Sequence, residues 1–136
     1  MAEPFAGPSR SERGVETILI AEDDHQARIL LKEILTAFGY AVIEATDGED
    51  ALAKFMDNRD RIQLMLLDMI MPKKRGNEVY DEIRKLGSTV KAVFLNGYPS
   101  DVVQGNQLLE QGLDLIMKPV SPRNLLMKLR EVLDGK

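Results

Sequence analysis

Short apolar runs alternate along the chain with segments whose apolar residues recur at helical spacing. Such runs are typical of strands covered on both faces, and the spacing between them is typical of amphipathic helices. Repeated strand–helix units favour right-handed crossovers, which place the strands in one parallel sheet between two layers of helices. The alternation therefore predicts an α/β fold with a five-stranded parallel sheet. The expected strands are Thr17–Ala21, Ala41–Ala45, Gln63–Leu67, Val90–Leu95 and Leu113–Met117.

The segments between these strands carry the boundary signals of helices. Asp47 and Ser121 occupy N-cap positions, Asp50 follows Asp47 as in a capping box, and Pro122 suits a first helical position. Gly39 stands where a helix would end in a left-handed C-cap. The expected helices are His25–Phe38, one that begins after Asp47 and buries Ala51, Leu52, Phe55 and Met56, then Asn77–Leu86, Ser100–Gln111 and Arg123–Leu133.

The length of 136 residues fits one domain. Residues 1–14 differ from the rest, because proline, glycine and serine alternate with charges and only one large apolar side chain is present. Such a segment buries too little surface to offset its ordering entropy. We therefore expect a flexible leader or linker over residues 1–14 and a folded domain over residues 15–136.

Composition excludes several classes of function. The net charge of −4 argues against nonspecific binding to nucleic acid or to an anionic membrane. The absence of cysteine excludes disulfides, thiolate nucleophiles and zinc–sulfur sites. No apolar run is long enough to cross a bilayer, and no signal peptide opens the chain. A cytoplasmic protein is the expectation.

Charged and polar side chains gather where the predicted strands end. Glu22 and Asp23 follow the first strand, Asp68 the third, Asn96 the fourth and Lys118 the fifth. Ligands of such sheets bind at the carboxyl ends of the strands. Carboxylates packed together raise one another's pKa unless a cation intervenes, and Mg²⁺ binds through few carboxylates while it engages phosphate oxygens. The pattern predicts a carboxylate nucleophile for phosphoryl transfer, assisted by Mg²⁺ and a lysine.

Four segments resemble the signatures of CheY-like receiver domains of two-component response regulators. They read ILIAEDDHQAR, LMLLDMIMPKKRG, VFLNGY and LIMKP, and the resemblance extends from about Thr17 to Leu133. It implies a flavodoxin-like sheet with strand order 2-1-3-4-5. It also implies that Asp68 accepts a phosphoryl group from a sensor histidine kinase or a histidine phosphotransfer domain, and that the domain signals by a conformational shift.

The resemblance also assigns roles within the site. Asp23 would bind Mg²⁺ directly and Glu22 through water, while the main-chain carbonyl of Ile70 completes the metal site. Lys118 would pair with the phosphoryl group. The Lys118–Pro119 peptide bond is expected to be cis.

Two positions depart from the family pattern. Asn96 replaces the usual serine or threonine, and Leu115 stands three residues before Lys118, where an aromatic residue is frequent. An asparagine amide can donate a hydrogen bond, but it is longer than a hydroxyl. We expect phosphorylation to proceed, with a muted change on the face formed by the fourth helix and fifth strand.

These departures keep a second hypothesis open, in which the protein is a pseudo-receiver that binds partners without phosphorylation. An aspartate-nucleophile phosphatase is a poorer fit, since that class needs a second aspartate where Ile70 stands. We expect no independent enzyme and no DNA-binding output domain within these residues. The GVETILIAEDD and FLNGY segments resemble receivers of hybrid sensor histidine kinases.

Overall fold

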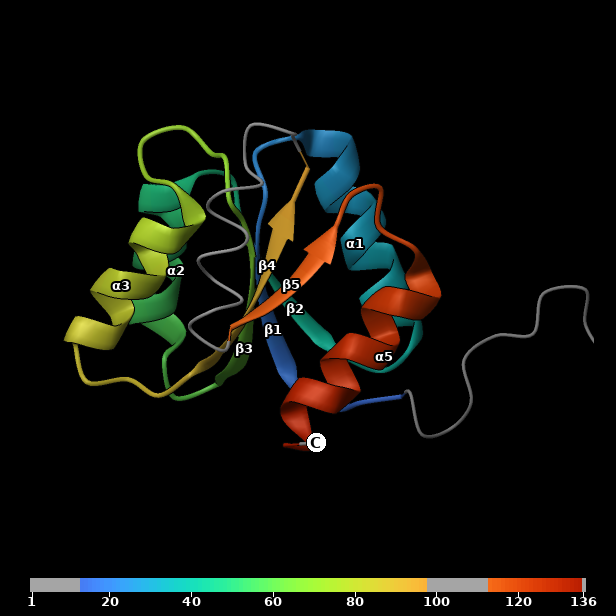
Figure 1. Cartoon of the computed structure of the whole chain (residues 1–136). Helices are drawn as coiled ribbons and strands as arrows, with labels where there is room; N and C mark the ends of the chain where they lie inside the picture. The colour runs from blue at the N-terminus through green and yellow to red at the C-terminus, as the bar shows by residue number, and fades with distance from the viewer. Residues whose placement is uncertain (1–12, 98–112, 136) are drawn as a thin grey trace, which may run out of the picture.

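A parallel sheet forms the centre of the computed structural model, which describes residues 13–97 and 113–135 (Figure 1). The order of its five strands is β2-β1-β3-β4-β5, and each neighbouring pair is parallel. This confirms the predicted fold class and strand order. The strands are β1 (Thr17–Ala21), β2 (Ala41–Ala45), β3 (Ile62–Asp68), β4 (Lys91–Asn96) and β5 (Asp114–Met117).

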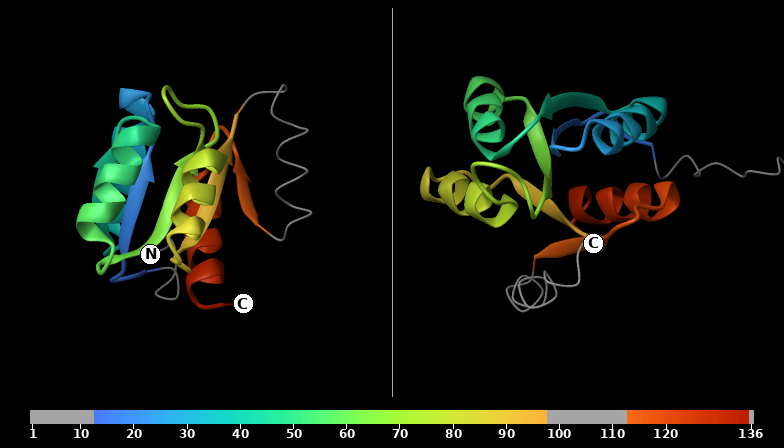
Figure 2. Two further views of the ribbon diagram at one scale, coloured as in Figure 1. Left: turned by 90° about the vertical axis from the view of Figure 1, so that its left-hand side faces the viewer. Right: turned by 90° about the horizontal axis from the view of Figure 1, so that it is seen from above.

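Helices cover both faces of the sheet (Figures 1 and 2). Helices α1 and α5 pack on one face, and α2 and α3 pack on the other. The expected helix Ser100–Gln111 lies outside the described residues. No helix in the described ranges is long and apolar enough to span a membrane. The helices are α1 (His25–Ala37), α2 (Gly48–Asn58), α3 (Gly76–Lys85) and α5 (Pro122–Leu133).

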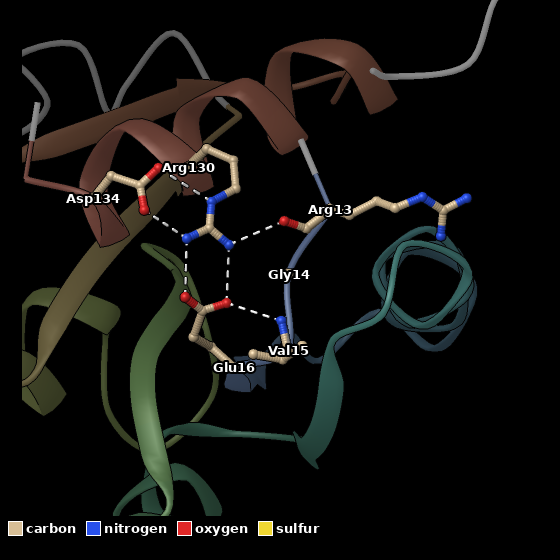
Figure 3. Close-up of a pocket in the computed structure, with 6 residues that line it drawn as sticks. All are labelled: Arg13, Gly14, Val15, Glu16, Arg130 and Asp134. Atoms are coloured by element: carbon tan, nitrogen blue, oxygen red, sulfur yellow. Dashed lines mark hydrogen bonds and ion pairs between the residues drawn. The ribbon is translucent and has the colours of Figure 1, made fainter. Parts of the chain in front are cut away.

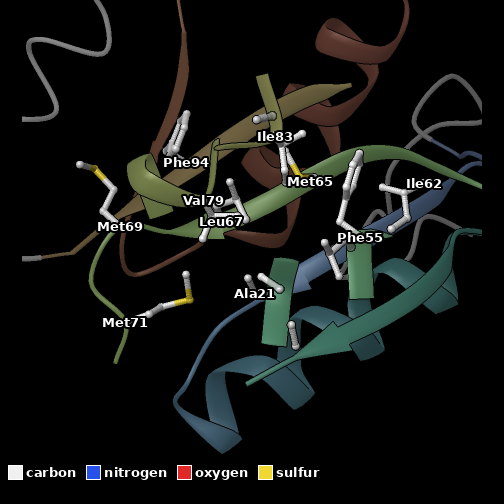
Figure 4. Packing of buried hydrophobic residues seen from close by; sticks show 14 residues of the cluster. Ala21, Phe55, Ile62, Met65, Leu67, Met69, Met71, Val79, Ile83 and Phe94 are labelled. Atoms are coloured by element: carbon white, nitrogen blue, oxygen red, sulfur yellow. The ribbon is translucent and has the colours of Figure 1, made fainter. Parts of the chain in front are cut away.

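The central strand β3 supplies side chains to both layers, which explains why its sequence is a continuous apolar run. Leu64 and Leu66 belong to the core beneath α1 and α5, whereas Met65 and Leu67 belong to the core beneath α2 and α3. Figure 4 shows the core beneath α2 and α3, in which Phe55 of α2 packs with Met65 and Leu67 of β3. Successive strand side chains point to opposite faces, so a strand covered on both sides needs apolar residues throughout.

Side-chain caps fix where the helices begin. Asp47 accepts a hydrogen bond from the Asp50 main-chain N–H at 2.7 Å, and Ser121 accepts one from Asn124 at 3.3 Å with Pro122 directly after it. These contacts confirm the predicted N-caps. The Asp50 carboxylate in turn accepts a hydrogen bond from the main-chain N–H of Thr46 at 2.9 Å. The local sequence thus determines the start of α2 and α5.

The structure corrects the buried stripe predicted for α2. Ala51 and Phe55 are buried and Leu52 is partly buried, but Met56 is 46% exposed. Met56 lies one residue beyond Phe55, a rotation of about 100° around the helix, which turns it away from the sheet. The narrower stripe suffices because α2 faces only one side of the core.

The two ends of the described chain meet at the edge opposite the carboxyl ends of the strands. Arg130 of α5 donates to both carboxylate oxygens of Glu16 at 2.9 Å, to the carbonyl of Arg13 at 3.2 Å and to Asp134 at 2.7 Å (Figure 3). These residues line a hollow of about 450 Å³. The N–H of Gly14 donates to the carbonyl of Phe38 at 3.0 Å, so both Arg13 and Gly14 are bound to the folded domain.

Candidate functional site

Three strand ends bring charged side chains to one edge of the sheet. Glu22 and Asp23 directly follow β1, and Asp68 is the last residue of β3, the strand beside β1. Lys118 follows β5 and reaches past β4, because its Nζ lies 2.8 Å from Oε1 of Glu22 and 3.0 Å from Oδ2 of Asp68. The sheet therefore assembles one ammonium and several carboxylates from segments far apart in sequence.

Burial and mutual repulsion set the electrostatics of the site. Glu22 and Asp68 are almost fully buried, whereas Asp23 is exposed. Burial, together with the neighbouring Asp68, raises the pKa of Glu22. The pKa of Asp23 is also raised, by its partial desolvation and by Glu22. Burial alone would lower the pKa of Lys118, but its hydrogen bonds to Glu22 and Asp68 outweigh this effect and raise it.

The carboxylates have the arrangement of a cation site. One oxygen from each of Glu22, Asp23 and Asp68 lies within 4.8 Å of the others. Such a set of hard oxygen donors suits Mg²⁺, which uses few protein ligands and keeps several waters. The main-chain N–H of Ile70 donates to Oδ1 of Asp68 at 3.3 Å, so the start of the following loop stays close to the carboxylates. These residues can hold a divalent cation.

The loop after β3 is packed tightly against the main chain of Asp68. The N–H of Gly76 donates to the carbonyl of Met69 at 3.1 Å, and the N–H of Met69 donates to the carbonyl of Leu95 at 3.0 Å. A Cβ atom at position 76 would collide with the carbonyl of Asp68. Glycine is therefore required there, and the close approach holds the main chain on which Asp68 sits.

Asn96 and Lys118 are joined through the main chain. Asn96 is the last residue of β4, rather than the first after it, and it is buried. Its carbonyl accepts a hydrogen bond from the N–H of Lys118 at 3.0 Å. The Lys118–Pro119 bond is cis, as predicted. Leu115 pairs in register with Phe94 and packs on the core between the sheet and α3, away from these charges.

Arg28 ends the family segment ILIAEDDHQAR, but its contact with the site was not predicted from the sequence. Its guanidinium donates from α1 to the main-chain carbonyl of Glu22 at 2.9 Å, and its side chain is only 10% exposed. The signal in the sequence is its place in that segment, five residues after Asp23. Only the folded structure turns that side chain back toward the end of β1.

Comparison with known proteins gives the family that the sequence motifs resemble, the response regulator receiver domains. The family model of the response regulator receiver domain matches residues 18–130. The transcriptional regulatory protein CpxR of Klebsiella pneumoniae is 40% identical over 118 residues, which are 85% of this chain and 48% of that protein. The chain spans about half the length of the curated relatives it matches.

Solved structures of receiver domains superpose on this one. A CheY-like response regulator receiver domain protein from Methanospirillum hungatei has a TM-score of 0.78 and 35% identity, covering 90% of this chain and 96% of that one. The receiver domain of the hybrid histidine kinase CckA has a TM-score of 0.71 and 29% identity, covering 86% and 98%. The family match, the strand order and the carboxylates of Glu22, Asp23 and Asp68 at the strand ends all point to the same family. The chain belongs to the response regulator receiver domains.

Proposed function

We propose that Asp68 is the phosphoacceptor of this receiver domain and that Mg²⁺ bound by Glu22, Asp23, Asp68 and the Ile70 carbonyl is required for the transfer. The observation that carries the proposal is the position of Lys118, whose ammonium bonds both Asp68 and Glu22. Asp68 has one cation beside it, the Lys118 ammonium, and carboxylate oxygens that could bind a second cation. Two cations would offset the negative charge of an incoming phosphoryl group, so the Asp68 carboxylate can act as its acceptor.

The transfer follows from these contacts. An oxygen of Asp68 attacks the phosphorus of a phosphohistidine, a P–O bond forms, and the P–N bond breaks with its electron pair on the imidazole nitrogen. Lys118 exchanges its bond with Asp68 for one with a phosphoryl oxygen and so neutralises part of the charge. Mg²⁺, when bound, supplies further neutralisation of the phosphoryl oxygens. Asn96, at the end of β4, would place its amide beside the new phosphoryl group.

The donor would be a sensor histidine kinase or a histidine phosphotransfer domain, and the reaction would take place in the cytoplasm. The domain would catalyse only its own phosphorylation and would act on no separate substrate. The receiver domain would occupy residues 15–136, preceded by a linker over residues 1–14. DNA binding, which the relatives' description as transcriptional regulators implies for them, would belong to a separate output domain. The donor, the compartment and the output domain are inferred from family membership and the net charge of −4, and the linker from the composition of residues 1–14.

Intact mass spectrometry tests the proposal. The protein is incubated with a small phosphodonor such as acetyl phosphate, with Mg²⁺ or with a chelator, and is then weighed. We expect the mass of one phosphoryl group to be added in the presence of Mg²⁺, and no addition with the chelator or in the variant Asp68→Asn. An unchanged mass in the native protein would instead favour the pseudo-receiver. A phosphorylated Asp68→Asn variant would move the acceptor to another residue.

A further inference from the structure

We infer that Arg28 is a positioning residue for the acidic pair: its guanidinium fixes the peptide between Glu22 and Asp23 and thereby directs Asp23 toward the metal. This inference rests on the proposed function, because it concerns the cation that Asp23 would bind. Arg28 would touch neither the metal nor its carboxylate ligands. It would affect Mg²⁺ affinity only through the main chain of Glu22 and Asp23.

The guanidinium of Arg28 is held from several sides. Its Nη1 donates to the carbonyl of Glu22 at 2.9 Å in a buried contact, and its Nε donates to Oε1 of Glu44 on β2 at 3.3 Å. Its Nη2 lies 3.1 Å from Nδ1 of His25. The planar fork of an arginine can bond a main-chain carbonyl and a carboxylate at the same time, in one fixed orientation. Glu44 therefore orients the group that holds Glu22.

The hydrogen bond to the Glu22 carbonyl affects Asp23, because this carbonyl belongs to the peptide group that joins the two residues. The N–H of Glu22 donates to the carbonyl of Ala45 at 3.1 Å, so the sheet pairing extends one residue past the end of β1. The next peptide plane contains the Glu22 carbonyl and the N–H of Asp23, and peptide planes are rigid. Once Arg28 fixes that carbonyl, the direction in which the chain enters Asp23 is set.

Asp23 depends on this main-chain support more than its neighbour does. The carboxylate of Glu22 is buried and bonds both Lys118 and the N–H of Asp24, at 2.8 and 3.1 Å. Asp23 is exposed. Partners outside the ligand set that orient the ligands typically contribute a factor of about 10 or more to metal affinity.

A positioning role and a purely electrostatic role predict opposite effects of removing Arg28. A cation beside the carboxylates repels Mg²⁺, so removing its charge alone should strengthen Mg²⁺ binding. Removing a group that orients Asp23 should weaken it. The direction of the change in affinity therefore separates the two roles.

Lys32 provides the matched control. It lies one turn further along α1, and its Nζ bonds Oε2 of the same Glu44 at 3.0 Å. Lys32→Ala removes one cation and one ion pair with Glu44, as Arg28→Ala does, but it leaves the Glu22 carbonyl bonded to Arg28. Arg28→Lys keeps the charge without the fork, and it also serves if the alanine variant does not fold.

The experiment is a Mg²⁺ titration of the whole chain, followed by the NMR shifts of main-chain amides. We expect Arg28→Ala to raise the Kd for Mg²⁺ about 10-fold, Arg28→Lys to raise it in the same direction, and Lys32→Ala to leave it within about twofold. Equal or tighter binding by both Arg28 variants, or an equal loss in Lys32→Ala, would overturn the inference. A native protein that binds no Mg²⁺ would overturn the proposed function, and the inference with it.

Discussion

Lys118 and Glu22 are separated by 96 positions in the sequence, yet Nζ of Lys118 donates to Oε1 of Glu22 over 2.8 Å. The same ammonium bonds Asp68 at 3.0 Å, so one side chain joins the segments after β1, β3 and β5. Only a quarter of the Lys118 side chain is exposed, and desolvation strengthens its interaction with both carboxylates. A metal ion held by Glu22, Asp23 and Asp68 would therefore compete with Lys118 for the same negative charges.

This competition predicts two opposite effects of Lys118→Met. Removing the ammonium leaves Glu22 and Asp68 without their fixed cation, so Mg²⁺ should bind more tightly, on the order of 10-fold. Phosphorylation of Asp68 should become slower, because one neutralising group is lost from the transition state. Titration with Mg²⁺ and timed mass spectrometry measure the two effects. Lys54→Met, which removes a lysine bonded to Asp50 on α2, should change neither quantity.

Asp23→Asn should abolish Mg²⁺-dependent phosphorylation, because an amide replaces the carboxylate proposed to bind the ion directly. Asp24→Asn is the matched control. Asp24 caps α1 by accepting from the N–H of Ala27 at 3.0 Å, and asparagine caps helices about as well as aspartate. The control should keep the native rate with acetyl phosphate. A native rate in Asp23→Asn would show that the metal ligands have been assigned wrongly.

Glu16→Gln should lower stability at neutral pH but not in acid. Hydrogen bonds from Arg130 lower the pKa of Glu16 below the ordinary value of 4.5. A carboxyl group with a lowered pKa stabilises the fold above its unfolded pKa, and this contribution is lost as the pH falls through the folded value. We expect a loss of about 1–2 kcal/mol at pH 7 from urea unfolding, which shrinks toward zero below the folded pKa.

Glu49→Gln serves as the comparison for that measurement, since Glu49 is exposed and lies 3.9 Å from Lys73. Its change in unfolding free energy should be small at both pH values. A loss in Glu16→Gln that stays the same in acid would mean that the charge of Glu16 is not the cause.

Neighbouring residues of α2 should respond very differently to truncation. Phe55 is 1% exposed within the core beneath α2 and α3, and Met56 is 46% exposed. Phe55→Ala should lower the free energy of unfolding by about 3–5 kcal/mol, through lost burial and the cavity that remains. Met56→Ala should change it by less than about 1 kcal/mol. Similar losses in chemical denaturation would contradict the orientation of α2.

Asn96→Thr should enlarge the response of β5 to phosphorylation. Asn96 is already buried at the edge of the site, so its interaction with the protein should differ little between the two states. A ligand shifts an equilibrium only by its differential affinity for the states. NMR shift changes on adding beryllofluoride, which stands in for the phosphoryl group, should be larger across Asp114–Met117 in the threonine variant. Equal changes in both proteins would contradict this reasoning.

Much of the architecture follows from the local sequence. Apolar runs and helical spacing identify the strands and helices that the structure describes, since the pleat and the helical turn impose their periods on short segments. The caps at Asp47 and Ser121 act over three residues and are visible without tertiary contacts. Errors arise where orientation depends on a partner. Met56 is apolar and was predicted to be buried, but its position on α2 turns its side chain toward solvent.

The residues that end the strands could also be predicted from the sequence alone, because Glu22, Asp23, Asp68 and Lys118 directly follow or complete apolar runs. How these residues come together could not be predicted, because it depends on the packing of the whole fold. The sheet order places β1 beside β3, which lets Lys118 reach across β4 to two carboxylates, and the packing of α1 brings Arg28 to the carbonyl of Glu22. Residue type and spacing are local properties, whereas the direction of a long side chain depends on every element packed around it.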